Sequence, residues 1–488
     1  MHSGDSLDPS DWHAFRAQAH AMLEDMLNYA EQLRERPVWQ PIPQSIHDRF
    51  QENLPQQGTE LALLHQRFLT EIMPYSIGNA HPGFMGWVQG GGTPVGMVAE
   101  MLAAGLNANV GGREQVPISV EKQILRWMRE LFQFPETANG LFVTGTSLAN
   151  LIAVLIARTT HLGVQARRDG IAHGDKKLTA YTSAGAHGSV SQAMDLAGFG
   201  TAALRPIPMN AAYQLDLDKL RAAIQTDKAA GFEPFLIIGS AGTVDVGAID
   251  DLTALANIAQ AENCWFHVDG AYGALGMLSP QIAPRLCGIE RASSIAFDFH
   301  KWGQVPYDAG YILVRDGAQQ LATFSAPAHY LKRETRGMAA GSPWPCDLGP
   351  DLSRGFRALK TWFTIATFGA EKLGQIINNT CELAQYLKQR VEQEPQLELL
   401  APVNLNIVCF RYVGTSKLSA SDLNNLNTEL VIRLQESGVV APSSTLIQHQ
   451  FAIRAAIVNH RTTRLDMDNL INTTLLLGGE LGIAATHP

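Results

Sequence analysis

Short apolar segments alternate with helical patterns across residues 94–324. This alternation constrains the fold more than any other feature, because strands that alternate with helices pair in parallel and carry helices on both faces of the sheet. The predicted strands are residues 177–182, 203–206, 235–240, 264–269 and 310–314, with two further apolar runs that begin at Gly140 and at Ser294. The predicted helices are residues 95–106, 118–132, 187–198, 217–228 and 249–262. We therefore expect an α/β domain with a mainly parallel sheet, and any ligand beyond the carboxyl ends of its strands.

At 488 residues the chain is too long for one simple domain. Hydrophobic residues make up 46% of it, which is enough to build a large core. An amphipathic helix at residues 11–34 precedes the α/β region. The regular elements predicted after it are residues 352–368, 371–391, 406–413, 420–437, 451–458 and 464–481. We expect an N-terminal helical arm at residues 1–93, a large α/β domain at residues 94–375 and a small α+β domain at residues 376–488.

Charge and cysteine usage argue against several classes of protein. The formal net charge is −9 and no basic run is present, so a nucleic-acid partner is not expected. The N-terminus does not resemble a signal peptide and no apolar run is long enough for a bilayer, so we expect a cytoplasmic protein without a membrane partner. Five scattered cysteines form no CxxC pair and the histidines form no HExxH, so no metal site is expected.

Lys301 follows the apolar run that begins at Ser294 and is enclosed by Phe297, Phe299 and Trp302. An ammonium group with aromatic neighbours is poorly solvated, which lowers its pKa and makes the amine a nucleophile for a carbonyl group. The alternative is a lysine at a strand end whose long side chain reaches water. This stretch alone favours neither interpretation.

Three other groups follow predicted strands. Thr146 and Ser147 open an apolar helix after a short strand, where free N–H groups and two hydroxyls can hold a phosphate; the alternative is an ordinary helix cap. Asp269 ends a strand, and its carboxylate either pairs with a protonated ring nitrogen or caps the next helix. His187 opens another helix, where its imidazole either stacks on a ring or is structural.

Together these groups match one cofactor. Pyridoxal 5′-phosphate requires a lysine for its aldehyde, a carboxylate for its pyridinium nitrogen, a histidine to stack on its ring and a binding site for its phosphate. They are predicted at the ends of successive strands of one sheet, so we expect this cofactor to be bound there.

The chain resembles the pyridoxal-phosphate-dependent group II decarboxylases, which include aromatic-L-amino-acid, glutamate, histidine and diaminobutyrate decarboxylases. The resemblance rests on His81-Pro82-x-Phe84, Thr146-Ser147 with Asn150, His187, His267-Val-Asp269-x-Ala271-Tyr272, Ser294-x6-Lys301-Trp302 and Phe356-Arg-Ala-Leu-Lys360-x-Trp362. It implies the aspartate-aminotransferase-like fold (fold type I) and a homodimer with sites at the interface. It also implies that Lys301 binds the cofactor aldehyde, Asp269 the ring nitrogen, and Thr146 and Ser147 the phosphate.

The same resemblance assigns further roles. His187 would stack on the ring, Ala271 would let the ring approach, Thr243 would lie near the cofactor, and His300 would contact the phosphate or the substrate. Substrate contacts are expected from His81, Trp87, Asn109 and Ser353. The implied reaction is decarboxylation of an L-amino acid, with an aromatic one as a candidate, to an amine and CO₂ through a Lys301 aldimine and a quinonoid.

The chain departs from this family at one point. In the aromatic branch a loop tyrosine returns a proton to Cα, whereas no tyrosine lies between Tyr330 and Tyr386 here. Relatives that lack it can divert the reaction to oxygen and form an aldehyde, so an oxidative aldehyde synthase is an alternative function. A homologue that binds the cofactor without turnover is a second. Residues 325–351, rich in Gly and Pro, are expected to form a mobile loop near the site.

Overall fold

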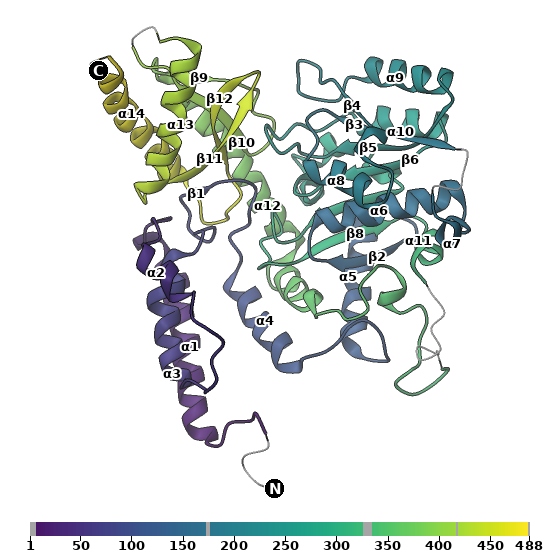
Figure 1. Cartoon of the computed structure of the whole chain (residues 1–488), viewed down its shortest axis with the longest axis horizontal. Helices are drawn as coiled ribbons and strands as arrows, with labels where there is room; N and C mark the ends of the chain where they lie inside the picture. The colour runs from purple at the N-terminus through teal and green to yellow at the C-terminus, as the bar shows by residue number, and fades with distance from the viewer. Residues whose placement is uncertain (1–5, 172–175, 326–333, 416–417, 487–488) are drawn as a thin grey trace.

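A computed structural model describes residues 6–171, 176–325, 334–415 and 418–486. Its strands form two sheets (Figure 1). The larger sheet has seven strands in the order β2-β8-β7-β6-β5-β3-β4, and the smaller has five in the order β1-β11-β12-β10-β9. The strands are β1 (Phe84–Met85), β2 (Asn139–Val143), β3 (Lys177–Ser183), β4 (Leu204–Ile207), β5 (Phe232–Ser240), β6 (Trp265–Asp269), β7 (Ser294–Asp298), β8 (Gly310–Val314), β9 (Leu397–Leu399), β10 (Ile407–Tyr412), β11 (Ala441–Ile447) and β12 (Gln450–Ala456).

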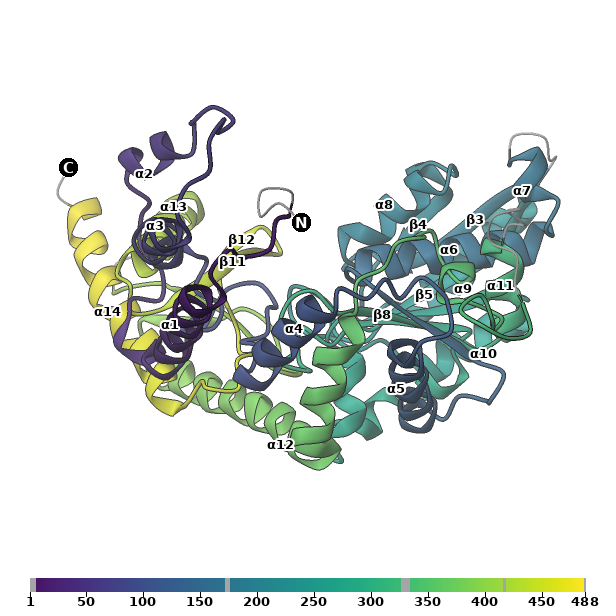
Figure 2. The same cartoon turned by 90° about the horizontal axis from the view of Figure 1, so that it is seen from below.

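Helices cover both faces of the larger sheet and also pack against the smaller one (Figure 2). They are α1 (Trp12–Glu31), α2 (Gln44–Arg49), α3 (Leu61–Arg67), α4 (Pro94–Leu106), α5 (Val116–Phe132), α6 (Thr146–Leu162), α7 (Ala166–Asp169), α8 (Gly188–Leu196), α9 (Leu217–Ala229), α10 (Leu252–Ala261), α11 (Gly317–Phe324), α12 (Arg357–Gln393), α13 (Ala420–Glu436) and α14 (Arg464–Thr486). Of these, α12, α13 and α14 pack against the smaller sheet. None of the helices among the described residues combines the length and apolar character that a membrane crossing needs.

The larger sheet is mainly parallel, as predicted. Strands β3 to β7 pair in parallel, and only β8 is reversed, since it pairs antiparallel with both β7 and β2. Every residue of β6, β7 and β8 is buried, because helices cover both faces. Alternate side chains divide between two cores, so that Ile295 and Phe297 of β7 face α5 and α10, whereas Ala296 faces α6 and α8 (Figure 2). Asp298 shares the face of Ala296 and therefore points toward α6.

The smaller sheet joins segments far apart in the sequence. Strand β1 pairs in parallel with β11, so the N-terminal segment adds an edge strand to a sheet built otherwise from the last hundred residues (Figure 1). Neither strand was predicted, because β1 has only two residues and β11 carries Pro, Ser and Thr in place of an apolar alternation.

One prediction about residues 352–391 needs correction. The helix expected from residue 352 begins at Arg357, because Arg354 is committed to tertiary contacts: its guanidinium binds Glu121 at 3.0 Å and the carbonyl oxygens of Val110 and Phe142. The predicted break between two helices is confirmed, because α12 is interrupted at Gly369, where φ is +74° and ψ is 159°, both outside the helical range. In the region expected to be a mobile loop, residues 326–333 lie outside the described residues.

Candidate active site

A cavity of 420 Å³ opens at the carboxyl ends of the central strands of the larger sheet. It brings together nine of the predicted site residues, namely Trp87, Thr146, Ser147, His187, Thr243, Asp269, Ala271, His300 and Lys301. These residues come from separate strand ends and helix starts, which is where a mainly parallel sheet collects its ligand-binding groups.

Lys301 lies in the turn after β7, and its ammonium contacts Asp298. Lys301 Nζ lies 2.8 Å from Asp298 Oδ2, and the backbone N–H of Thr146 donates to Asp298 Oδ1 at 2.8 Å. Asp298 therefore connects the lysine to the first turn of α6. Sequence reasoning assigned Asp298 no role, although its position at the end of an apolar strand, three residues before Lys301, was a usable signal.

Asp269 ends β6 and is held by two hydrogen bonds. The Ala271 N–H donates to Asp269 Oδ1 at 3.1 Å, and Asn150 Nδ2 donates to Oδ2 at 3.0 Å. Asn150 lies on the same face of α6 as Thr146, one turn later. The Asp269 carboxylate is thereby fixed in orientation at the cavity wall, as a partner for a ring nitrogen must be.

The contacts of Asn150 extend into the core. Its Oδ1 accepts from His267 Nε2 at 2.9 Å, and Ser294 Oγ lies 2.8 Å from His267 Nδ1. Burial lowers the pKa of His267 to about 4, so the ring is neutral at pH 7. With Nε2 donating to Asn150, Nδ1 accepts from the Ser294 hydroxyl. Asn150 and His267 belong to the sequence motifs described above, but those motifs did not predict that the two residues position Asp269.

Thr146 and Ser147 open α6, as predicted. Gly145 precedes them in an extended conformation, and Thr146 is buried. The Thr146 hydroxyl has no hydrogen-bond partner among the described residues. A buried hydroxyl without a partner is costly, so its position beside a helix N-terminus fits the phosphate of pyridoxal 5′-phosphate.

Two histidines line the cavity with defined tautomers. His300 Nδ1 accepts the Ala309 N–H at 3.0 Å, so its Nε2 carries the proton and lies 3.6 Å from Asp298 Oδ2. Burial lowers the pKa of His300, which keeps that ring neutral.

His187 caps α8, and its Nδ1 accepts the Ser189 N–H at 3.1 Å, which leaves Nε2 as a donor.

Tyr307 also lines this cavity and was not predicted. Its ring lies over His300 with 4.2 Å between centroids, and its carbonyl oxygen accepts from the buried Lys360 ammonium at 3.0 Å. Partial burial and the nearby Asp298 carboxylate raise the pKa of the Tyr307 phenol, which therefore keeps its proton at pH 7. The Thr243 hydroxyl accepts the Ala248 N–H at 3.0 Å, which orients this side chain at the cavity wall.

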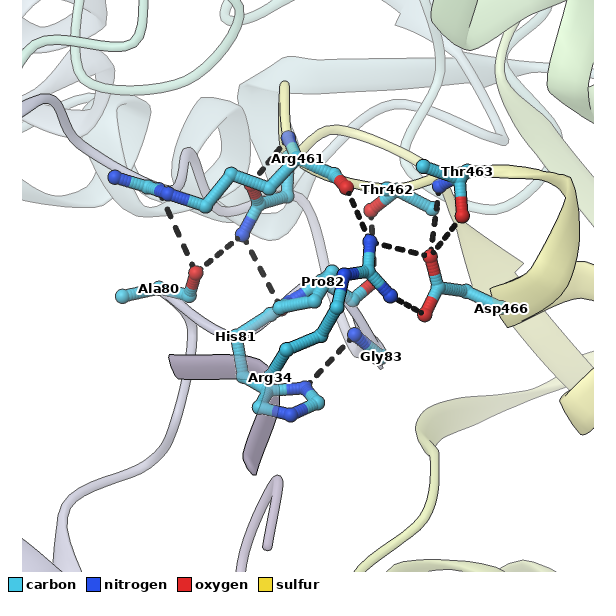
Figure 3. A network of polar contacts seen from close by, with 10 residues as sticks. Arg34, Ala80, His81, Pro82, Gly83, Arg461, Thr462, Thr463 and Asp466 are labelled. Carbon is cyan, nitrogen blue, oxygen red and sulfur yellow. Dashed lines mark hydrogen bonds and ion pairs between the residues drawn. The ribbon is translucent and has the colours of Figure 1, made fainter. Parts of the chain in front are cut away.

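His81, Asn109 and Ser353 lie outside the cavity lining formed by the described residues. Figure 3 shows His81 beside the Arg34–Asp466 ion pair, and its Nδ1 accepts the Gly83 N–H at 2.9 Å. This network ties the end of the N-terminal helical region to the start of α14.

Asn109 and Ser353 belong to a second surface. Asn109 Oδ1 accepts the N–H of Arg354 at 3.1 Å, and the neighbouring Ser353 is exposed. Trp344, from the predicted loop, packs against the Arg113 guanidinium, which lies 4.6 Å from the centre of its ring. Tyr330 is outside the described residues.

Comparison with known proteins gives consistent matches over most of the chain. Residues 43–413 match the family described as the pyridoxal-dependent decarboxylase conserved domain. An aromatic-L-amino-acid decarboxylase of Bacillus atrophaeus is 31% identical over 96% of this chain and 95% of that protein. A phenylacetaldehyde synthase of Arabidopsis thaliana is 27% identical over 93% of this chain and 94% of that protein.

The fold agrees with the sequence matches. A crystal structure of Oryza sativa TDC with PLP and tryptamine superposes with a TM-score of 0.88 at 23% identity, covering 98% of this chain and 100% of that one. The chain therefore belongs to the pyridoxal-dependent decarboxylase family, and it is an amino-acid carboxy-lyase whose cofactor is pyridoxal 5′-phosphate.

Proposed function

We propose that the enzyme decarboxylates an aromatic L-amino acid to its amine and CO₂, with the cavity around Lys301 as its active site. The observation that carries the proposal is the convergence of Lys301 and the fixed Asp269 carboxylate in one cavity. Two aromatic side chains at its mouth, Trp87 and Tyr307, are 52% and 47% exposed and offer flat surfaces to a substrate ring. The name of the Bacillus relative supports the same substrate class.

Each residue of the cavity has a proposed task. Lys301 holds the cofactor aldehyde, and Asp269, oriented by Asn150, keeps the ring nitrogen protonated. The phosphate accepts hydrogen bonds from Thr146, Ser147 and the neutral His300 N–H. The ring lies between His187 and Ala271, with Thr243 at its edge. When bound, the cofactor draws electrons from the Cα bond perpendicular to its ring.

A proton must return to Cα after CO₂ leaves. His187 Nε2 and the Tyr307 hydroxyl are the donors that we propose to test, because both belong to side chains that line the cavity. His187 Nδ1 accepts a backbone N–H, which leaves Nε2 as the donor, and the Tyr307 phenol keeps its proton at pH 7. Neither depends on the loop after residue 325.

A decarboxylation-dependent aldehyde synthase is the second candidate, because residues 331–385 contain no tyrosine. The test is a panel of L-amino acids in air, with product identification and Lys301→Ala as the inactive control. Amine and CO₂ in equal amounts support decarboxylation. Aldehyde with ammonia and hydrogen peroxide would instead establish the oxidative reaction, and no product from any amino acid would contradict both.

We also propose a homodimer in which Asn109 and Ser353 serve the partner's cavity. They lie together on one surface, where the Val110 N–H donates to the Arg354 carbonyl oxygen at 2.9 Å. Helix α4 exposes Met101, Leu102 and Leu106, an apolar face typical of subunit interfaces. The test mixes Lys301→Ala subunits with Ser353→Trp subunits. Activity is restored only if one cavity takes its Lys301 from one subunit and its Ser353 from the other.

Two further features remain proposals. We propose that residues 1–93, 94–375 and 376–488 act as arm, cofactor domain and small domain; the seven-stranded sheet lies wholly within the second segment. A cytoplasmic location suits a chain whose five cysteines follow no disulfide pattern.

A further inference from the structure

Asp298 is a buried carboxylate inside the proposed phosphate site, and the functions proposed above give it no task. It is 2% exposed and is the last residue of β7. One oxygen accepts the first N–H of α6, from Thr146, at 2.8 Å. The other lies 2.8 Å from Lys301 Nζ and 3.6 Å from His300 Nε2. Asp298 thus contacts three of the groups assigned to the cofactor.

A negative charge at this position opposes the binding of an anion. A helix N-terminus holds phosphate through its free N–H groups and its positive dipole end. Here the Thr146 N–H and the Lys301 ammonium already face a carboxylate of the protein itself. Because the site is buried, water and salt screen the repulsion between this carboxylate and an incoming phosphate only weakly.

We propose that Asp298 competes with the cofactor phosphate for the N-terminus of α6 and thereby sets the affinity of the enzyme for pyridoxal 5′-phosphate. This proposal rests on the proposed assignment of Thr146 and Ser147 to the phosphate. An asparagine at position 298 keeps an oxygen that can accept the Thr146 N–H and removes the charge. Affinity for the cofactor should therefore rise in Asp298→Asn.

The test uses purified full-length protein stripped of cofactor. Wild type, Asp298→Asn and Asp316→Asn are each titrated with pyridoxal 5′-phosphate and, separately, with pyridoxal, which has no phosphate. Dissociation constants are measured from the absorbance of the bound ring. Asp316 caps α11, and asparagine caps a helix as well as aspartate does. Asp316 lies just after β8 and outside the cavity, so this control removes one negative charge of the same kind elsewhere in the domain.

In Asp298→Asn we expect the dissociation constant for pyridoxal 5′-phosphate to fall about tenfold or more, because a charge within about 4–6 Å shifts the ionisation equilibrium of a carboxyl group by about 1–3 log units, and a phosphate at this site would lie as close to Asp298. The constant for pyridoxal should change little, and Asp316→Asn should match wild type for both ligands. Unchanged or weaker binding of pyridoxal 5′-phosphate would overturn the proposal, as would an equal gain for pyridoxal. Asp298→Ser, which is also neutral, repeats the test if the asparagine variant does not fold.

One further variant separates this proposal from the site assignment. Thr146→Ala should weaken pyridoxal 5′-phosphate more than pyridoxal, because only the former has the phosphate. If Thr146→Ala behaves so while Asp298→Asn equals wild type, the phosphate site stands and the role of Asp298 is rejected. If Thr146→Ala affects neither ligand, the phosphate assignment itself is rejected, and with it the role of Asp298.

Discussion

Asn150 orients Asp269, the carboxylate that we propose as the partner of the cofactor ring nitrogen. Its amide nitrogen donates to Asp269 while its oxygen accepts from His267, so both ends are committed. We predict that Asn150→Ala lowers cofactor affinity and costs about 1–3 kcal/mol of folding free energy, since it leaves buried polar groups unsatisfied. Asn150→Asp should bind cofactor more weakly still, because it places a second carboxylate against Asp269. Cofactor titration and urea unfolding measure the two effects. Wild-type affinity in Asn150→Asp would contradict this account.

His267 makes a prediction about pH. Burial lowers its folded pKa to about 4, below the ordinary value of about 6.5 for an unfolded histidine. The unfolded chain therefore binds one more proton between these values, so the stabilisation is complete above pH 6.5 and is lost as pH falls toward 4. The full effect is on the order of 3 kcal/mol. The amide of His267→Gln can still donate to Asn150. In this variant the slope of unfolding free energy against pH should correspond to the uptake of about one proton fewer on unfolding in this window. An unchanged slope would show that His267 does not titrate as described.

At the scale of elements, the sequence predicts well where local pattern and tertiary structure agree. Strands β6 and β7 are mainly apolar and each ends in an aspartate, so both the strands and the sites after them were predictable. The pairing of β1 with β11 was not, because two residues carry no periodicity and the partner lies far away in the chain. The start of α12 was misplaced because the buried contacts of Arg354 outweigh helix propensity just before it.

Helix α12 carries a prediction of its own at its kink. Gly369 has φ +74° and ψ 159°, a region that only glycine occupies readily, and a Cβ there would meet no atom within 4 Å. Gly369→Ala should therefore cost about 1–3 kcal/mol through backbone strain alone. Gly479 in α14 is the matched control, because a Cβ there also meets nothing within 4 Å and no positive φ is required. Gly479→Ala should stabilise by about 0.5–1 kcal/mol. Equal effects of the two substitutions in urea unfolding would refute the strain argument.

At the scale of the whole molecule, the candidate site residues divide into two groups. One group lines the cavity of its own chain, and the other, His81, Asn109 and Ser353, lies outside that lining. The N-terminal segment has the surface to bring two chains together, since α1 buries none of its side chains within the described residues and α4 exposes an apolar face. A dimer that covers these helices would explain both features and would make activity depend on association.

The apolar face of α4 makes this dependence measurable. Leu106 is 64% exposed there, and Leu476 on α14 is 63% exposed on a different helix, so the two residues form a matched pair. Leu106→Lys should weaken association by about 2 kcal/mol or more, because it places a charge in the core of an interface. Sedimentation should then show monomers at concentrations where wild type is dimeric, with activity falling in parallel as concentration drops. Leu476→Lys should sediment and react as wild type does. If Leu106→Lys also matches wild type in both measurements, α4 is not the dimer interface. An interface at α4 then cannot be what brings Asn109 and Ser353 to a partner's cavity.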